Sequence, residues 1–350
     1  IYNNTNYGIT VTSNSNVIHH NNLIKNNGAT RGASGNSQAY DSGTGNVWYD
    51  AATGQGNYWS NWDQQGSYPI DGGTASDNAP LPMEDMHPGI HINGDDQFTP
   101  ENGVKSGLGT QSEPYIIEGW NIDAQGDSYG IWIENTTAYF VIKDCNVWNA
   151  ADGTNAPYGA GIALNNVRNG RIENSVCSNS KVGIYLYGSS QTNVLTGNYV
   201  YNNEIGICLE ESDSNTLTNN NASSNTNYGI YLYSSNSNTI TYNWICDNTY
   251  YGVYLREGSS GNTINYNNFF RNNGASKGVI GNSQACDDVV GGNNNWDYNS
   301  WSNWNNEGTY PIAGEAGAED RSPIPEFSNV PFFAVLFLCI LGIVARKRNH

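Results

Sequence analysis

The sequence predicts an all-β protein in which short parallel strands stack into a solenoid. Three observations support this fold class: a phrase that recurs every 23 residues, an alternation of apolar and polar residues within each phrase, and a scarcity of helix-forming residues. The 350 residues include 40 Gly and 24 Tyr but only 2 Met and 8 Phe, so a large helical core has few side chains to build it. The formal net charge of −18 argues against a nucleic-acid partner, which requires a basic surface.

The repeated phrase aligns its apolar residues in columns. Copies begin at four glycines spaced 23 residues apart: Gly183, Gly206, Gly229 and Gly252. Three inward columns result: Ile184, Ile207, Ile230 and Val253; Leu186, Leu209, Leu232 and Leu255; Leu195, Leu217, Ile240 and Ile264. At the next turn, a fourth column consists of asparagines whose amides can bond from copy to copy: Asn198, Asn220, Asn243 and Asn267. One copy cannot bury its apolar residues alone, and the pattern therefore predicts a right-handed parallel β-helix.

A longer duplication divides the chain into units. Residues 26–39 reappear at 272–285, and Trp59-Ser60-Asn61-Trp62 reappears as Trp301-Ser302-Asn303-Trp304. Each Trp-rich segment follows a final rung, and we expect it to cap the open edge of the strands. The predicted organisation is the final rungs and cap of an N-terminally truncated β-helix over 1–82, a junction leading into a second unit over 83–113, a second β-helix with its cap over 114–323, and a C-terminal signal over 324–350.

The C-terminal segment predicts export and anchoring. Residues 327–345 carry no charge and are long enough to span a bilayer, and the basic residues Arg346, Lys347 and Arg348 follow at once. With Pro325, Glu326 and Phe327 before it, the segment resembles the Pro-Glu-Phe type (PEF-CTERM-like) sorting signals of archaeal surface proteins. The resemblance implies a transmembrane or sorting helix, an extracellular location tethered to the cytoplasmic membrane, and a sortase-like processing enzyme as partner. A buried core helix is the alternative.

The rungs and the Trp-rich segments also resemble a known family. The rungs, Asn57-Tyr58-Trp59-Ser60 and the later Tyr68-Pro69-Ile70 are similar to NosD-like β-helix proteins of archaeal cell surfaces, and 114–120 looks like the start of the same domain. The resemblance implies the fold and says little about activity. The NosD name carries an association with copper, for which thioether and imidazole ligands are suitable: Met83, Met86, His87 and His91. These residues lie in a Pro-rich junction, so a plain linker is the preferred interpretation and no cofactor is expected.

Tyrosines form the best predicted binding surface. Tyr185, Tyr231 and Tyr254 share an outward column that Cys208 interrupts, and Tyr187 and Tyr233 flank it. Stacked tyrosines either pack across strands or offer a flat platform to sugar rings. Three sequons are possible N-glycosylation sites and fit a surface location: Asn3, Asn135 and Asn221.

The expected function is that of a non-catalytic cell-surface protein, either structural or adhesive, with surface glycans or surface-layer proteins as partners. The alternative is a carbohydrate-active enzyme, which needs carboxylates that converge on one site. The candidates are Asp287 and Asp288, which lie in the loop after the last rung, and Glu210, whose neighbours in register are not carboxylates. Solvated polar loops are the preferred interpretation of these acids. A copper-binding NosD-like protein is the third possibility.

Overall fold

The structure is a computed structural model that describes residues 4–19, 21–23, 26–29, 36–51, 56–59, 66–80, 87–151, 157–276 and 282–325. The chain divides into two compact units, Ile1–Met86 and His87–His350. Within the described ranges the regular elements are strands and short 3-10 helices, and no helix there is long and apolar enough to cross a membrane. The predicted anchor, 326–350, lies outside the described residues.

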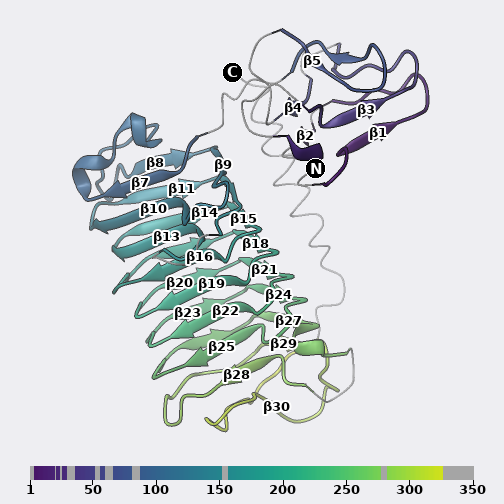
Figure 1. Cartoon of the computed structure of the whole chain (residues 1–350). Helices are drawn as coiled ribbons and strands as arrows, with labels where there is room; N and C mark the ends of the chain where they lie inside the picture. Colours follow the sequence, from purple (N-terminus) through teal and green to yellow (C-terminus); the bar gives the residue numbers. More distant parts are fainter. Residues whose placement is uncertain are drawn as a thin grey trace. The chain divides into compact units, whose positions relative to one another are not determined.

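The second unit is a parallel β-helix whose strands form three sheets along its length (Figure 1). We call them sheets 1, 2 and 3, in the order in which the chain visits them in each rung. Sheet 1 contains β7 (Ile90–Asn93), β10 (Tyr129–Thr136), β13 (Ala160–Val167), β16 (Val182–Tyr187), β19 (Ile205–Glu210), β22 (Tyr228–Tyr233), β25 (Val253–Arg256) and β28 (Ala285–Asp287).

Sheets 2 and 3 are built from shorter strands. Sheet 2 contains β8 (Tyr115–Glu118), β11 (Phe140–Lys143), β14 (Gly170–Glu173), β17 (Val194–Thr196), β20 (Thr216–Thr218), β23 (Thr239–Thr241) and β26 (Thr263–Asn265). Sheet 3 contains β9 (Asn121–Asp123), β12 (Asn146–Trp148), β15 (Val176–Ser178), β18 (Tyr199–Tyr201), β21 (Asn221–Ser223), β24 (Trp244–Cys246), β27 (Asn268–Phe270) and β29 (Ser300–Trp301).

The predicted inward columns are confirmed by the register of the strands. Ile184, Ile207 and Ile230 are direct partners in successive strands of sheet 1, and the leucine column beside them is aligned in the same way. In sheet 2, Leu195 pairs with Leu217 and Leu217 with Ile240. All these side chains are fully buried, so the apolar residues of each rung are covered by those of its neighbours.

Buried asparagines form ladders at all three corners of the rung. Asn220 is representative: its backbone N donates to Asn243 Oδ1 over 2.9 Å, and its Nδ2 donates to Asn243 Oδ1 over 3.0 Å and to Leu195 O over 2.9 Å. The ladder members are Asn193, Asn215, Asn238, Asn262 and Asn294 at the first corner; Asn198, Asn220, Asn243, Asn267 and Asn299 at the second; and Asn203, Asn225, Asn248 and Asn272 at the third. These bonds satisfy corner backbone groups that no strand can pair.

The repeated glycine reflects the same close packing. A Cβ at Gly206 would lie 2.5 Å from the carbonyl oxygen of Gly229 and 2.8 Å from Asn225 Nδ2. No side chain fits there without moving the backbone of the next rung, which explains why each copy of the phrase begins with glycine.

Trp301 continues the column of buried side chains beyond the last full rung. Its ring stacks on Phe269 at 4.1 Å and on Tyr310 at 4.1 Å, and its Nε1 donates to Asp320 Oδ2 over 3.0 Å. Tyr310 lies in β30 (Tyr310–Pro311), which pairs antiparallel with β31 (Glu319–Asp320). The Trp-rich segment is thus tied to the last rung by ring stacking and by one buried carboxylate.

The first unit repeats the end of the second. Its parallel pairs are β1 (Ile9–Val11) with β3 (Ala39–Asp41) and β2 (Asn22–Leu23) with β4 (Tyr58–Trp59), and its antiparallel pair is β5 (Tyr68–Pro69) with β6 (Ser76–Asp77). Trp59 Nε1 donates to Asp77 Oδ2 over 2.9 Å and its ring stacks on Tyr68 at 4.0 Å. The duplicated sequence therefore builds the same bonds in both units.

One strand begins earlier than the sequence predicts. We expected the first strand after Pro114, with His91 in the junction before it. The structure instead places His91 inside β7, which pairs with β10 through Ile131↔Ile90 and Glu134↔Asn93. The apolar residues Ile90 and Ile92 are fully buried and start the core of the second unit.

Candidate functional site

The outer face of sheet 1 carries most of the aromatic residues that sequence analysis singled out. One outward column runs through His91, Trp132, Ala163, Tyr185, Cys208, Tyr231, Tyr254 and Cys286. A second runs through Asn93, Glu134, Asn165 and Tyr187, and Glu210, Tyr233 and Arg256 continue it. The two columns lie two residues apart on each strand, so they form one continuous surface.

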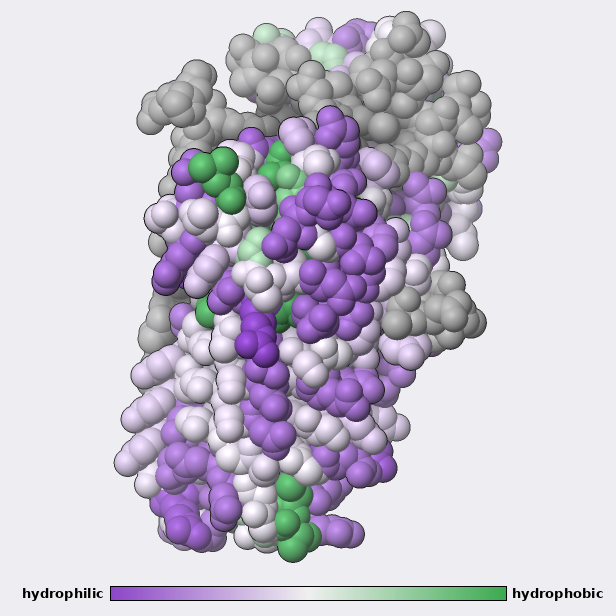
Figure 2. Space-filling model, turned by 90° about the vertical axis from the view of Figure 1, so that its left-hand side faces the viewer, coloured by the Kyte–Doolittle hydropathy of each residue, from purple (hydrophilic) through white to green (hydrophobic). Residues whose placement is uncertain are grey.

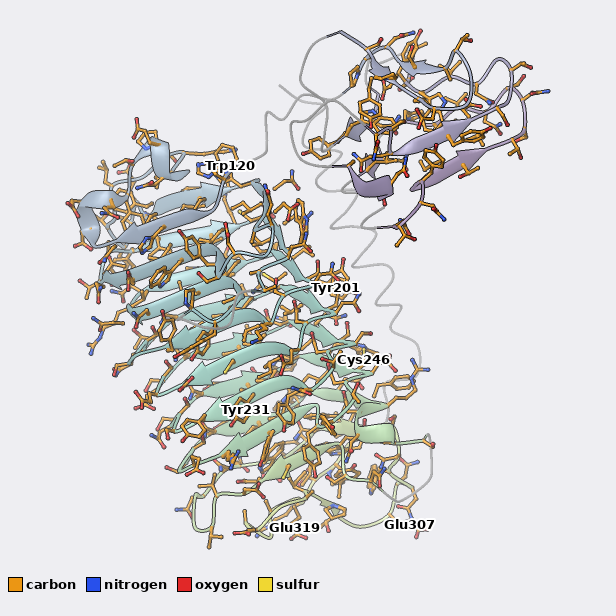
Figure 3. The ribbon with its side chains drawn as sticks, in the orientation of Figure 1. Trp120, Tyr201, Tyr231, Cys246, Glu307 and Glu319 are labelled. Atoms are coloured by element: carbon orange, nitrogen blue, oxygen red, sulfur yellow. The ribbon has the colours of Figure 1, made fainter. Side chains whose placement is uncertain are left out.

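The C-terminal part of this face is a cluster of partly exposed tyrosines. Tyr228 lies 5.3 Å from Tyr231 and 5.1 Å from Tyr254, measured between ring centroids, and Tyr231 lies 5.5 Å from Tyr254. Tyr233, Tyr250 and Tyr251 border them. We call these six residues the tyrosine cluster; Figure 3 labels Tyr231 on the front sheet of the second unit.

Polar groups hold the rings of the tyrosine cluster in place. Tyr254 Oη donates to Asp288 Oδ2 over 2.6 Å, and Arg256 lies in register with Tyr233 and beside the Tyr231 hydroxyl. Burial raises the pKa of Tyr231 and that of Tyr254, and the Asp288 carboxylate raises the latter further. The phenols therefore stay protonated and can donate hydrogen bonds throughout the physiological range.

The side chains in the middle of the first outward column are buried. Tyr185, one of the predicted platform residues, is only 3% exposed, and Cys208 beside it is 5% exposed. Tyr185 stacks on Tyr187 at 4.6 Å, hydrogen-bonds Glu210 and lies 6.3 Å from Tyr158, which belongs to the turn before β13. Tyr185 therefore packs within the face and offers no surface, whereas Tyr187, Tyr231, Tyr233 and Tyr254 stay partly exposed.

The N-terminal part of the face holds a histidine–glutamate pair that the sequence did not reveal. His91 Nε2 lies 2.9 Å from Glu134 Oε1, and Asn165 Nδ2 donates to Glu134 Oε2 over 3.0 Å. The imidazole stacks on Trp132 at 4.2 Å with 7° between the planes. Glu134 is 8% exposed, and its charge adds to the burial that raises the pKa of the neighbouring Tyr187. This group places an imidazole and a carboxylate in hydrogen-bond contact beside an aromatic surface.

The carboxylates weighed as catalytic residues have structural partners. Asp287 is 2% exposed and accepts from Trp296 Nε1 over 3.2 Å and from Asn294 Nδ2 over 3.1 Å. Asp288 accepts from Tyr254, and Glu210 from Tyr185. Among the described residues, no group of three or more His, Cys, Asp and Glu side chains is arranged to hold a metal ion.

The remaining predicted site residues fall in different places. His87 Nδ1 lies 2.7 Å from Pro88 O and its ring lies against Trp120, away from the partners of His91, while Met83 and Met86 lie outside the described residues. Of the sorting signal, Pro325 is exposed, and Glu326, Phe327, Arg346, Lys347 and Arg348 lie outside the described part of the chain.

The sequons differ in accessibility. Asn135 is exposed, although its Nδ2 donates to Asn93 Oδ1 over 3.0 Å. Asn221 lies in sheet 3 between Tyr199 and Trp244, and its Oδ1 is buried with no hydrogen-bond partner in the described structure. Asn3 lies outside the described residues.

Comparison with known proteins identifies the fold. Residues 129–297 match the family described as the right-handed β-helix region. No protein of curated function matches the sequence.

Several solved structures are similar at low identity. DFA-IIIase from Arthrobacter chlorophenolicus A6 in complex with DFA-III is 15% identical with a TM-score of 0.38, and the match covers 64% of this chain and 57% of that one. The same enzyme without its lid is 16% identical with a TM-score of 0.35, covering 61% and 46%. A mutant of the periplasmic alginate epimerase AlgG is 15% identical with a TM-score of 0.39, covering 75% and 64%.

The chain spans about half the length of the DFA-IIIase structures that it matches. At this level of identity the similarity concerns the fold alone. With the parallel register of its three sheets, the second unit is a right-handed parallel β-helix.

Proposed function

We propose that this protein is a non-catalytic cell-surface β-helix that binds glycans through the outer face of sheet 1. The single observation that carries the proposal is the tyrosine cluster, in which partly exposed rings from neighbouring rungs lie 5.1–5.5 Å apart beside Arg256 and Asp288. Sugar rings bind through their C–H faces to aromatic rings and through their hydroxyls to fixed polar groups. The cluster supplies both kinds of contact on one rigid sheet.

The charge of the face selects among glycans. Glu134, Glu210 and Asp288 lie on or beside it, and Arg256 is the one arginine or lysine in the two outward columns among the described strands. The whole chain adds a formal net charge of −18. A polyuronate would be repelled by this field, so we propose neutral or amino-sugar glycans as the ligand class.

The proposed location and processing of the protein are based on its sequence. The resemblance to NosD-like archaeal surface proteins and to Pro-Glu-Phe sorting signals supports export, a tether at the C-terminus, a sortase-like enzyme as processing partner and a membrane anchor through that segment. Surface-layer proteins are further candidate partners. We also propose that the Trp-rich segments cap the β-helices; the stacking of Trp301 between Phe269 and Tyr310, and of Trp59 on Tyr68, supports this role.

A glycan array probed with the full chain tests the proposal. We expect binding to neutral or amino-sugar glycans that the double variant Tyr231→Ala with Tyr233→Ala weakens by at least about tenfold, a loss of about 1.4 kcal/mol or more. The matched control is Tyr199→Ala with Tyr201→Ala, because these residues also point outward two positions apart on one strand, but in sheet 3. Equal losses in both variants, or no binding by the full chain, would contradict the proposal.

A carbohydrate-active enzyme is the second candidate, and the His91–Glu134 pair is the observation that favours it. General acid–base catalysis needs a proton donor and acceptor held beside the bound sugar, and this pair lies against Trp132 on the same face. Release of reducing ends or unsaturated products from a panel of polysaccharides is the test. Product release by the full chain that disappears in His91→Asn and Glu134→Gln would establish the enzyme and overturn the non-catalytic assignment.

A further inference from the structure

The outer face of sheet 2 carries a regular array of threonines. In two outward columns, six of the eight positions on β17, β20, β23 and β26 are threonine, all partly exposed: Thr196, Thr218 and Thr241 in one column and Thr216, Thr239 and Thr263 in the other. Val194 and Asn265 complete the block. We call these eight residues the threonine block.

The threonine block has two fixed repeat distances. Neighbouring strands lie about 4.8 Å apart, and outward residues of one strand, two positions apart, are separated by about 6.7 Å. The strands pair in uninterrupted register across the block. Its side chains therefore form a regular two-dimensional lattice.

The ladders on either side make this lattice rigid. Each three-residue strand lies between two buried asparagines, as Thr216–Thr218 lies between Asn215 and Asn220. Asn215 N donates to Asn238 Oδ1 over 2.8 Å, and Asn220 N donates to Asn243 Oδ1 over 2.9 Å. The rung spacing is thus set at both ends of every strand before any ligand arrives, which removes the ordering cost of binding.

The chemistry of the block is uniform and uncharged. Each threonine offers one methyl and one hydroxyl, and none of the six hydroxyls bonds to another group of the described chain. None of the eight side chains of the block is charged; charged residues border it at Arg171 and Glu173 on the preceding strand, at Asp297 after Asn265, and at Asp213 in the turn before β20. A charge would organise its own hydration shell, whereas hydroxyls and methyls in a lattice let water adopt the lattice spacing.

We infer that the threonine block binds ordered water and that its ligand is the surface of ice. The oxygen atoms of hexagonal ice repeat at distances close to the two spacings of the block. The threonine hydroxyls, together with water molecules ordered around the threonine methyl groups, can therefore match the ice surface over several rungs. Threonine is common in strands, and its presence alone would carry no conclusion. Four features together point to a crystalline ligand. The threonines form two aligned columns, their hydroxyls have no partner in the described chain, the block carries no charge, and the asparagine ladders fix the spacing of its strands. The block itself contains no aromatic ring, but the exposed Tyr242 and Tyr266, stacked 5.3 Å apart, directly follow β23 and β26 and border it.

Uptake of the full chain into slowly growing ice tests the inference, with thermal hysteresis measured in parallel. We expect the full chain to enter ice in excess of a non-binding reference protein. Thr218→Lys with Thr241→Lys, which are register partners, should reduce uptake by at least about tenfold. The matched control is Asn146→Lys with Val176→Lys, outward register partners in sheet 3, which should retain uptake.

Circular dichroism melting verifies that each variant is folded. Should the lysine pair unfold, Thr218→Tyr with Thr241→Tyr replaces it, because outward strand positions of this β-helix already accept tyrosine at Tyr199 and Tyr201. Exclusion of the full chain from ice, or equal loss in the threonine and control variants, overturns the inference. Glycan binding by the threonine variants is expected to be unchanged, so the two proposals fail separately.

Discussion

Asp287 illustrates how a single carboxylate acquires its role from its surroundings. In the sequence it is one of two adjacent acidic residues and a candidate catalytic carboxylate. In the structure it is buried and accepts from Trp296 Nε1, and Asp41 accepts from Trp48 Nε1 over 2.8 Å in the first unit. Because both units use the aspartate to hold a buried indole, its role is structural.

Replacement of this acceptor should destabilise the second unit. In Asp287→Ala, the Trp296 indole N–H and the Asn294 amide lose a buried acceptor, and we expect the free energy of unfolding to fall by about 1–3 kcal/mol. Urea denaturation followed by tryptophan fluorescence measures this change. The exposed Glu211→Gln serves as the control, and an unchanged midpoint in Asp287→Ala would refute the structural role.

Asp320 should make stability depend on pH. Burial raises the pKa of its carboxyl above the ordinary value of 3.8, although Trp301 Nε1 and two backbone N–H groups partly offset the rise. A raised pKa in the folded state means that the protonated form stabilises the fold. This contribution is complete below pH 3.8 and disappears as the pH rises through the folded pKa. The stability of the wild type relative to Asp320→Asn should therefore fall with increasing pH above 3.8, as measured by urea denaturation at a series of pH values; a flat difference would contradict this assignment.

Alternation along a strand predicted which side chains point outward but not which remain accessible. Tyr185 and Tyr231 occupy equivalent positions in the 23-residue repeat, yet only Tyr231 is partly exposed. Tyr185 is covered by Tyr187 in its own strand, by Glu210 in the next rung and by Tyr158 in a turn outside the repeat. Such coverage depends on residues distant in sequence, and a pattern within one strand does not contain it.

At the scale of the strand, the regular rungs could be read from the sequence and the irregular ones could not. The copies between Gly183 and Gly252 share one length, so counting residues aligns their columns. β7 lacks the repeated phrase and is separated from β10 by η2 (Asp95–Gln97), η3 (Pro100–Asn102), β8 and β9. His91 and Glu134 are therefore in contact although they lie 43 residues apart in the sequence. The 23-residue period of the regular rungs does not predict this pairing.

The asparagine ladders should contribute strongly to the stability of the rungs. Asn243→Ala removes the acceptor for Asn220 N and the donor to Leu217 O in the middle of the β-helix. Because buried backbone groups then lack partners, we expect a loss of about 1–3 kcal/mol in the free energy of unfolding, measured by urea denaturation. Asn227→Ala, which loses only an exposed bond to Glu204, should change it little. Equal losses of unfolding free energy in the two variants would show that the ladder bonds contribute no more than an exposed hydrogen bond.

The whole chain is acidic, and the face shown in Figure 2 carries mainly hydrophilic and intermediate residues with only small hydrophobic patches. A field of this sign acts on a charged polymer before any contact forms. Neutral glycans are not affected by this field. The salt dependence of binding therefore distinguishes a specific aromatic site from non-specific electrostatic binding.

Salt should therefore change the apparent selectivity. Any residual binding of an anionic polysaccharide such as alginate should increase between about 0.01 and 0.15 M salt, as the Debye length falls from about 30 to about 8 Å, whereas binding of neutral glycans should stay constant. Surface plasmon resonance with immobilised polysaccharides measures both. Alginate binding that weakens as salt is added would indicate attraction to a basic site and would contradict the proposed ligand class.

The ladders that join each rung to the next also have a consequence for evolution. Since each of the rungs joined by the Asn198–Asn267 ladder receives from one neighbour the same bonds that it gives to the other, a rung of this kind can be inserted or deleted without creating a new kind of interface. Gene segments that encode 23 residues could thus lengthen or shorten the protein in steps of about 4.8 Å. A lineage could in this way change the length of the β-helix while both outer faces keep their chemistry.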